Sequence, residues 1–162
     1  MCDYCGCRRS GPTAELAAEH RRLLDYSDVL HHALHSGVDA ASVFAEFVLL
    51  LQKHAAKEEI GLFDQARSLG PLADQIEILC SEHEDLRRWL ADGLAGTQVA
   101  AALRLLATHI DDEEYDLFPH IFHALDPEQW DEIELAHRAV DAVWHAEGPA
   151  SPAAVVTGAS PS

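Results

Sequence analysis

The sequence has few basic residues and almost no runs in which apolar and polar residues alternate. It contains 11 Lys and Arg against 28 Asp and Glu, for a formal net charge of −17 at pH 7. A surface of that charge repels phosphate groups, so we expect neither nucleic acid nor an anionic membrane as a partner. The lack of alternating runs leaves little basis for β-strands, and the Ala, Leu and Glu content favours helices.

Long uncharged apolar runs are missing as well. The N-terminal region has no continuous apolar segment of the secretory type, and charge or His interrupts every long apolar stretch within 18 residues. We therefore predict a cytoplasmic protein without a transmembrane span. Its four cysteines would mostly stay reduced in that compartment.

A chain of 162 residues with 48% hydrophobic residues is typical of one folded domain. Residues that start and stop helices predict five helices, at about 12–36, 40–69, 71–93, 97–124 and 126–147. Gly37 is a candidate C-cap of the first helix, Pro71 would open the third, and Pro119 is a possible kink or break in the fourth. The sequence Asp126-Pro127-Glu128-Gln129 has the form of a capping box that starts the fifth. Short connections predict an all-α, up-down-up-down four-helix bundle with a short fifth C-terminal helix. The expected segments are a cysteine-containing leader (1–11), the bundle (12–125), the additional helix (126–147) and a flexible tail (148–162).

Two copies of a ten-residue pattern occur, HAAKEEIGLF from His54 and HIDDEEYDLF from His109. A shorter pattern, EHxxL, begins at Glu19 and again at Glu82. The resulting order is EHxxL, HxxxEExxLF, EHxxL, HxxxEExxLF. Each half would form one helical hairpin, and two packed hairpins would give a pseudo-twofold bundle.

Helical geometry predicts which side chains of the repeat face the core. Residues four apart differ by roughly 40° in direction, so the His and the first Glu of each copy share a face. Leucines lie three or four residues away on that face, at Leu50, Leu51, Leu62, Leu105, Leu106 and Leu117. In the first helix the inward face would carry Leu16, His20, Leu23, Ser27, Leu30 and Leu34. Four residues of the repeat fall to the side and are expected to be solvated: Lys57, Glu59, Asp112 and Glu114.

Two carboxylates and four imidazoles in one core need an explanation. An unpaired buried carboxylate costs several kcal/mol, and two close together repel each other. A lone buried His is usually an ordinary core residue, and an isolated His-x-x-x-Glu is usually an exposed pair. Their repeated conjunction instead predicts metal ligands, because carboxylates can bridge two cations and imidazole suits iron, zinc, copper and nickel.

The motif order resembles the hemerythrin-like (HHE cation-binding) domain, over about Thr13 to Phe122. The segment from His109 to Pro119, HIDDEEYDLFP, is especially specific. The resemblance implies a four-helix bundle with two non-haem iron ions, bridged by oxide or hydroxide, in which Glu58 and Glu113 also bridge. The ligands that it implies are His20, His54, Glu58, His83, His109 and Glu113.

This chain departs from the oxygen-carrying hemerythrins at two positions. Those proteins have a further histidine one turn after the third-helix ligand, where this chain has Arg87, and an aspartate one residue beyond the position of Glu113. Four histidines instead of five predict an open position on the second iron. We therefore expect reaction with hydrogen peroxide, nitric oxide or oxygen, with catalase-like or nitric oxide detoxification favoured over oxygen carriage. The alternative is a non-enzymatic iron or oxygen binding or sensing module.

Several groups outside the motifs leave their roles open. Cys2-x-x-Cys5-x-Cys7 offers three of the four ligands of a zinc site, but a redox-active thiol pair, a disulfide or a plain leader fits as well. The fifth helix is expected to cap one side of the bundle, with a partner surface as the alternative. For the remaining histidines and tyrosines we favour roles away from the metal; these residues are His31, His32, His35, His120, His123, Tyr26 and Tyr115.

Overall fold

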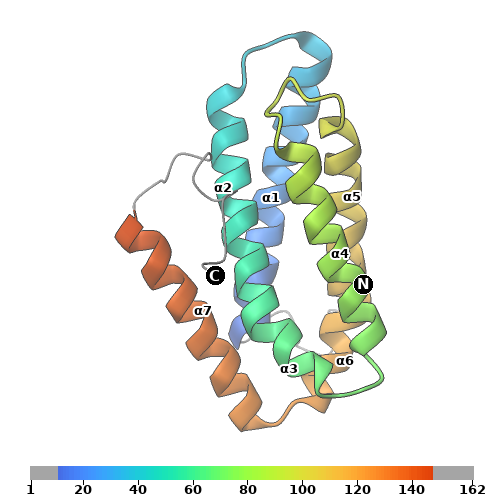
Figure 1. Ribbon diagram of the computed structural model, residues 1–162, viewed down its shortest axis with the longest axis vertical. Helices are drawn as coiled ribbons and strands as arrows, with labels where there is room; N and C mark the ends of the chain where they lie inside the picture. The colour runs from blue at the N-terminus through green and yellow to red at the C-terminus, as the bar shows by residue number, and fades with distance from the viewer. Residues whose placement is uncertain (1–10, 148–162) are drawn as a thin grey trace, which may run out of the picture.

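The computed structural model describes residues 11–147, and its regular structure there is entirely helical (Figure 1). The elements are α1 (Gly11–Ser36), α2 (Ala41–Lys57), η1 (Glu58–Leu62), α3 (Phe63–Arg67), α4 (Ala73–Leu90), α5 (Val99–Asp112), η2 (Glu113–Leu117), α6 (Phe118–Ala124) and α7 (Pro127–Glu147). The elements η1 and η2 are π-helical turns that join their neighbours without a break. The predicted all-α class and its five helical stretches are therefore confirmed for this range.

Two details differ from expectation. The fifth helix, α7, has 21 residues and α4 has 18, so the prediction of a short fifth helix was wrong. Pro71 does not open α4, which begins two residues later at Ala73. The predicted leader and tail fall largely or wholly outside the described residues. Within 11–147, none of the helices combines the length and apolar character that crossing a bilayer requires.

Local signals explain where the helices begin and end. The main-chain N–H of Gln129 donates to Oδ1 of Asp126 at 2.9 Å, and the side chain of Gln129 accepts from the N–H of Asp126 at 3.1 Å. This reciprocal capping box starts α7, as the sequence predicted. After α1 the chain turns at Gly37, whose φ of 69° lies in the left-handed region where glycine is unstrained.

The helices pack around a shared core. The first helix, α1, contacts α2 and α5, and α4 contacts α2 and α5, while α7 lies along α1, α2 and η1 (Figure 1). Helix α7 covers one side of the bundle, which is the position expected of a capping helix. Each of the helical stretches therefore buries one apolar stripe against its neighbours.

The buried apolar side chains form two separate clusters. One includes Leu23, Phe47 and Leu86, and the other includes Leu16, Phe63 and Phe118. The inward stripe of α1 follows the prediction except at Leu34, which is 37% exposed, whereas the neighbouring Ala33 is buried. The gap between the two clusters is occupied by polar residues, which form the candidate site.

Candidate metal centre

Four histidines and two glutamates lie together between the two apolar clusters. Each is at most 1% exposed, and each comes from the helix on which the sequence placed it. The apolar residues before and after each one pack into the two clusters, and this packing holds the polar side chains at one level of the bundle. The residues brought together are His20 (α1), His54 (α2), Glu58 (η1), His83 (α4), His109 (α5) and Glu113 (η2).

The two carboxylates form the middle of this cluster. The Nε2 atom of His54 lies 3.1 Å from Glu58, and Nε2 of His83 lies 3.3 Å from the other oxygen of Glu58. Likewise, Nε2 of His20 lies 3.1 Å from one oxygen of Glu113. Glu58 and Glu113 thus belong to two overlapping groups of possible ligands, one with His20 and His54 and one with His83 and His109.

An outer carboxylate accepts a hydrogen bond from Nδ1 of each histidine. His54 donates to Glu19 at 3.0 Å, and His109 donates to Glu82 at 2.8 Å. A carboxylate can only accept, so Nδ1 carries a hydrogen and Nε2 is the nitrogen directed into the cluster. Such outer partners orient metal-binding histidines in known sites.

The other two outer carboxylates correct a prediction. His83 donates to Glu59 at 2.8 Å, and His20 donates to Glu114 at 2.9 Å. We expected both glutamates to be solvated, but their side chains are only 29% and 13% exposed. Glu59 and Glu114 do lie on the predicted side of their own helices. A neighbouring helix, however, brings an imidazole against that side, so neither glutamate is fully solvated. Of the four residues expected to be solvated, Asp112 alone is exposed as predicted.

The structure also explains why the second Glu and the Phe recur in both copies of the ten-residue pattern. Phe118 of the second copy stacks on His20, with ring centroids 5.8 Å apart, and Phe63 of the first copy stacks on His83 at 5.7 Å. Each ten-residue copy therefore supplies one His and one Glu to the cluster. It also supplies a second Glu and a Phe that hold the histidine of an EHxxL motif. The signal for these roles was present in the repeat, because Glu19, Glu82 and both second glutamates recur in it.

The π-helical turns occur at the same position in both copies. The main-chain N–H of Phe63 bonds to the carbonyl of Glu58, and that of Phe118 bonds to the carbonyl of Glu113. Such turns accommodate one additional residue and are common at functional sites. Pro119 is not their cause, because the first copy has Asp64 at the matching position and forms the same turn.

The inward atoms lack hydrogen-bond partners, which tests whether a cation fits. Both carboxylate oxygens of Glu58 and of Glu113 are buried without a hydrogen bond, as are the Nε2 atoms of His20 and His54. The Nε2 atoms of His83 and His109 lie 2.9 Å apart. Because the Nδ1 atoms of both rings already carry hydrogens, two Nε2 atoms at that distance need a proton or a metal ion between them. Four imidazole nitrogens around two shared carboxylates fit a pair of metal ions.

The pKa shifts within the cluster also indicate that positive charge is favoured there. Burial acts to lower the pKa of His109, but the negative charge of Glu113 close by and the hydrogen bond to Glu82 outweigh it and raise that pKa to about 10. Burial acts to raise the pKa of Glu58, but His54 and the other nearby histidines outweigh it and hold that pKa well below its ordinary value. The two buried carboxylates therefore need compensating positive charge, which either protons on the histidines or bound metal ions can supply.

The two halves of the centre differ in what surrounds them. Lys57 is 1% exposed and forms ion pairs with Glu19 at 2.8 Å, with Asp141 of α7 at 3.0 Å, and with Glu15. We predicted that Lys57 would be solvated, so this is a second correction. The matching residue of the second copy is the exposed Asp112. A buried cation therefore supports the outer carboxylate of His54, whereas the outer carboxylate of His109 has no lysine at the matching position.

Arg87 occupies the place where oxygen carriers have a further histidine. Its Nη2 atom donates to Glu59 at 2.6 Å, and the same oxygen of Glu59 accepts from His83. Arg87 therefore acts on the cluster through Glu59.

The remaining polar candidates lie elsewhere or outside the described residues. Tyr26 donates to Glu46 at 2.9 Å, and Tyr115 is half-exposed. The rings of His31 and His35 contact each other on the exposed face of α1. The zinc interpretation for Cys2, Cys5 and Cys7 falls on residues that the structure does not describe.

A known protein family matches most of the chain. The family model described as "Hemerythrin HHE cation binding domain" matches residues 11–121, which include all six side chains of the buried cluster. No curated protein and no solved structure matches the chain.

Proposed function

Because the chain belongs to the hemerythrin HHE cation-binding domain family, we propose that it is a non-haem di-iron protein. The observation that carries this proposal is the set of buried, inward-pointing oxygen and nitrogen atoms without hydrogen-bond partners around Glu58 and Glu113. The proposed ligands are His20, His54, Glu58, His83, His109 and Glu113, with the two glutamates shared between the ions.

The proposal includes the up-down-up-down four-helix arrangement expected of this family. Contacts of α1 with α2 and α5, and of α4 with α2 and α5, support it. In this arrangement the apolar clusters above and below the site exclude water. The outer carboxylates Glu19, Glu59, Glu82 and Glu114 hold the imidazoles with Nε2 directed inward.

We propose that the substrate is a small oxidant or gas, with hydrogen peroxide or nitric oxide favoured over carried oxygen. Iron held by these residues would supply the exchange of electrons with such molecules, which side chains alone do not perform. The number of histidines supports turnover over carriage. His83 and His109 are the imidazoles available on their side of the cluster, and Arg87 stands where a fifth histidine would lie, bonded to Glu59.

The ligand assignment is tested by removing each shared carboxylate. We expect Glu58→Ala and Glu113→Ala to lose at least one of two irons per chain, measured by metal analysis after desalting. Glu84→Ala is the matched control, because Glu84 is an exposed acid next to His83 on α4. Retention of two irons by both variants would contradict the assignment.

The reactivity is tested with the iron-loaded protein. We expect oxygen release after addition of peroxide, or loss of nitric oxide from solution, at rates above those of free iron and of the Glu113→Ala variant. If neither reaction exceeds free iron, the proposed turnover is wrong. An optical spectrum that changes reversibly with oxygen on degassing would instead favour the binding and sensing alternative.

A further inference from the structure

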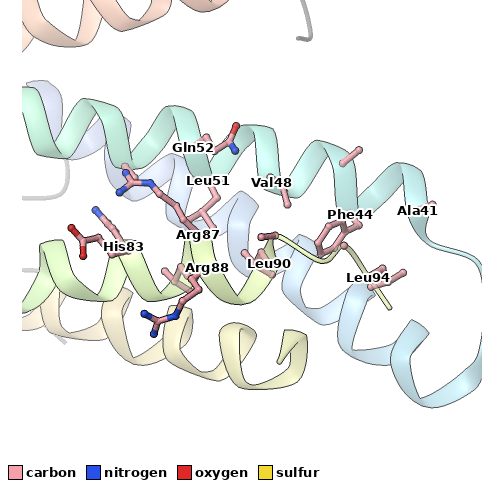
Figure 2. A pocket seen from close by; sticks show the side chains of 16 residues that line it. Ala41, Phe44, Val48, Leu51, Gln52, His83, Arg87, Arg88, Leu90 and Leu94 are labelled. Atoms are coloured by element: carbon pink, nitrogen blue, oxygen red, sulfur yellow. The ribbon is translucent and has the colours of Figure 1, made fainter. Parts of the chain in front are cut away.

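A cavity of about 810 Å³ lies between α2 and α4, beside the metal centre, and His83 is the only one of the six proposed ligands that lines it. It extends from His83 and Arg87 at one end to Phe44 and Leu94 at the other (Figure 2). Neither the family assignment nor the proposed reaction gives this cavity a role. Peroxide and diatomic gases are about as small as water, whose share of liquid volume is about 30 Å³. The cavity therefore has room for a much larger molecule.

The walls of the cavity are mainly apolar. Phe44, Leu51, Leu86 and Leu90 are each less than a tenth exposed and form its floor. Its volume falls in the range of small-molecule sites, roughly 300–1,000 Å³, which are lined mostly by apolar side chains with a few polar groups. An alkyl chain lying along these residues would remove apolar surface from water, which favours binding.

The polar groups gather at one end of the cavity. Figure 2 shows Arg87 extending from α4 toward α2, whereas Arg88, which also lines the cavity, extends away from α2. The guanidinium of Arg87 has five N–H donors, and its hydrogen bond to Glu59 uses one nitrogen. Arg87 is 42% exposed at its side chain, so the remaining donors are accessible to a ligand. Planar donors of this kind pair with carboxylates.

We propose that this cavity binds a straight-chain carboxylic acid of medium length, with its carboxylate at Arg87 and its alkyl chain along Phe44, Leu86 and Leu90. The net charge of −17 repels anions from the rest of the surface, so such a ligand would bind only where a local cation and an apolar trough coincide. The site does not require the metal centre, but it adjoins it, because Glu59 links Arg87 to His83.

The ligand class is tested by calorimetric titration of the full-length protein, as purified and after iron removal with a chelator. We expect decanoate to bind with one site per chain in both preparations. Affinity should fall about threefold to fourfold for each methylene removed. Decan-1-ol, which lacks the charge, should bind at least tenfold more weakly. Equal binding of the alcohol would overturn the carboxylate assignment, and absence of decanoate binding would overturn the site. Because binding is measured without iron as well, its failure is distinct from failure of the proposed di-iron function.

The location is tested by filling the cavity from its exposed wall. Ala45→Phe places a ring in the cavity from the surface of α2 and should lower decanoate affinity at least tenfold. Ala41→Phe serves the same purpose if that variant folds poorly. Ala107→Phe, on the exposed face of α5, is the matched control and should leave affinity unchanged.

The charged end of the site is tested separately. Arg87→Gln should weaken decanoate binding at least tenfold, while Arg104→Gln should not. Unchanged affinity in the cavity variants, or equal loss in the controls, would overturn the proposal.

Discussion

The Nζ atom of Lys57 lies 2.8 Å from Oε1 of Glu19 in the interior of the bundle. The other oxygen of Glu19 accepts the Nδ1 hydrogen of His54, so a buried cation is connected through one carboxylate to the candidate metal centre. Lys57 also pairs with Asp141, which makes α7 part of the same network. The fifth helix is thus tied electrostatically to one half of the centre.

Removal of the Lys57 charge should destabilise the protein strongly. Breaking a buried ion pair leaves an uncompensated charge, so we expect Lys57→Met to lower the free energy of unfolding by about 3 kcal/mol. Lys53→Met is the control, because Lys53 pairs with Asp141 at the surface edge and should cost at most about 1 kcal/mol. Both values come from urea denaturation followed by circular dichroism. Equal losses in the two variants would contradict a special role for the buried lysine.

The outer carboxylates should control metal affinity without being ligands. Replacing an outer partner of a ligating histidine typically weakens metal binding about 10–100-fold. We expect losses in that range for Glu19→Gln, Glu59→Gln, Glu82→Gln and Glu114→Gln, measured by competition with a chelator of known affinity. The exposed Glu84→Gln should bind metal like the unmodified protein. If the four variants behave like that control, the histidines do not depend on these hydrogen bonds.

The contact between α7 and α2 should depend on acid pH through Asp141. Burial acts to raise the pKa of Asp141, but its ion pairs with Lys53 and Lys57 outweigh burial and hold the pKa below its ordinary value of 3.8. The stabilisation is therefore complete above pH 3.8 and is lost as the pH falls through the lowered pKa.

We expect Asp141→Asn to cost about 1 kcal/mol at neutral pH, because the pairs are partly exposed, and progressively less below pH 3.8. The comparison uses urea unfolding across this range. Asp131→Asn, at an exposed position of the same helix, should show no such pH-dependent difference. A constant difference between Asp141→Asn and the unmodified protein at every pH would rule out this titration as its source.

Gly61 should be required for the packing of α7. A Cβ atom at Gly61 would lie 3.3 Å from Cδ2 of His137 and 3.4 Å from Cβ of Ala136. The matching residue of the second copy is the exposed Asp116, which α7 does not cover. We expect Gly61→Asp to cost about 1–3 kcal/mol, because a larger side chain there forces the helices apart.

The milder Gly61→Ala variant separates crowding from backbone effects. Alanine needs a shift of only tenths of an ångström and is the better helix former, so its net effect should stay within about 1 kcal/mol. Limited proteolysis between α6 and α7 should be faster for Gly61→Asp than for Gly61→Ala. If both variants unfold and are cleaved like the unmodified protein, α7 does not depend on close approach at this glycine.

Local sequence signals predicted most of the helix boundaries. The capping box at Asp126 and the glycine at Gly37 act through hydrogen bonds within a few residues, so they can be recognised without the fold. The π-helical turns at Glu58 and Glu113 had no such signal. They lie where the buried site meets the apolar cluster that contains Phe63 and Phe118, and the first of them forms without a proline.

Periodicity and repetition within the chain determined the helical class and the six inward-facing polar residues, because both depend on spacing along single helices. Only the tertiary structure decided what lies opposite each helix face. Glu59 and Glu114 fall to the side of their own helices, yet His83 and His20 meet them from neighbouring helices. Lys57 would be solvated on an isolated helix, but α1 and α7 enclose it with acids. A side chain's environment is set by the packed neighbours as much as by its own helix, and packing brings together residues as far apart as Glu15 and His137.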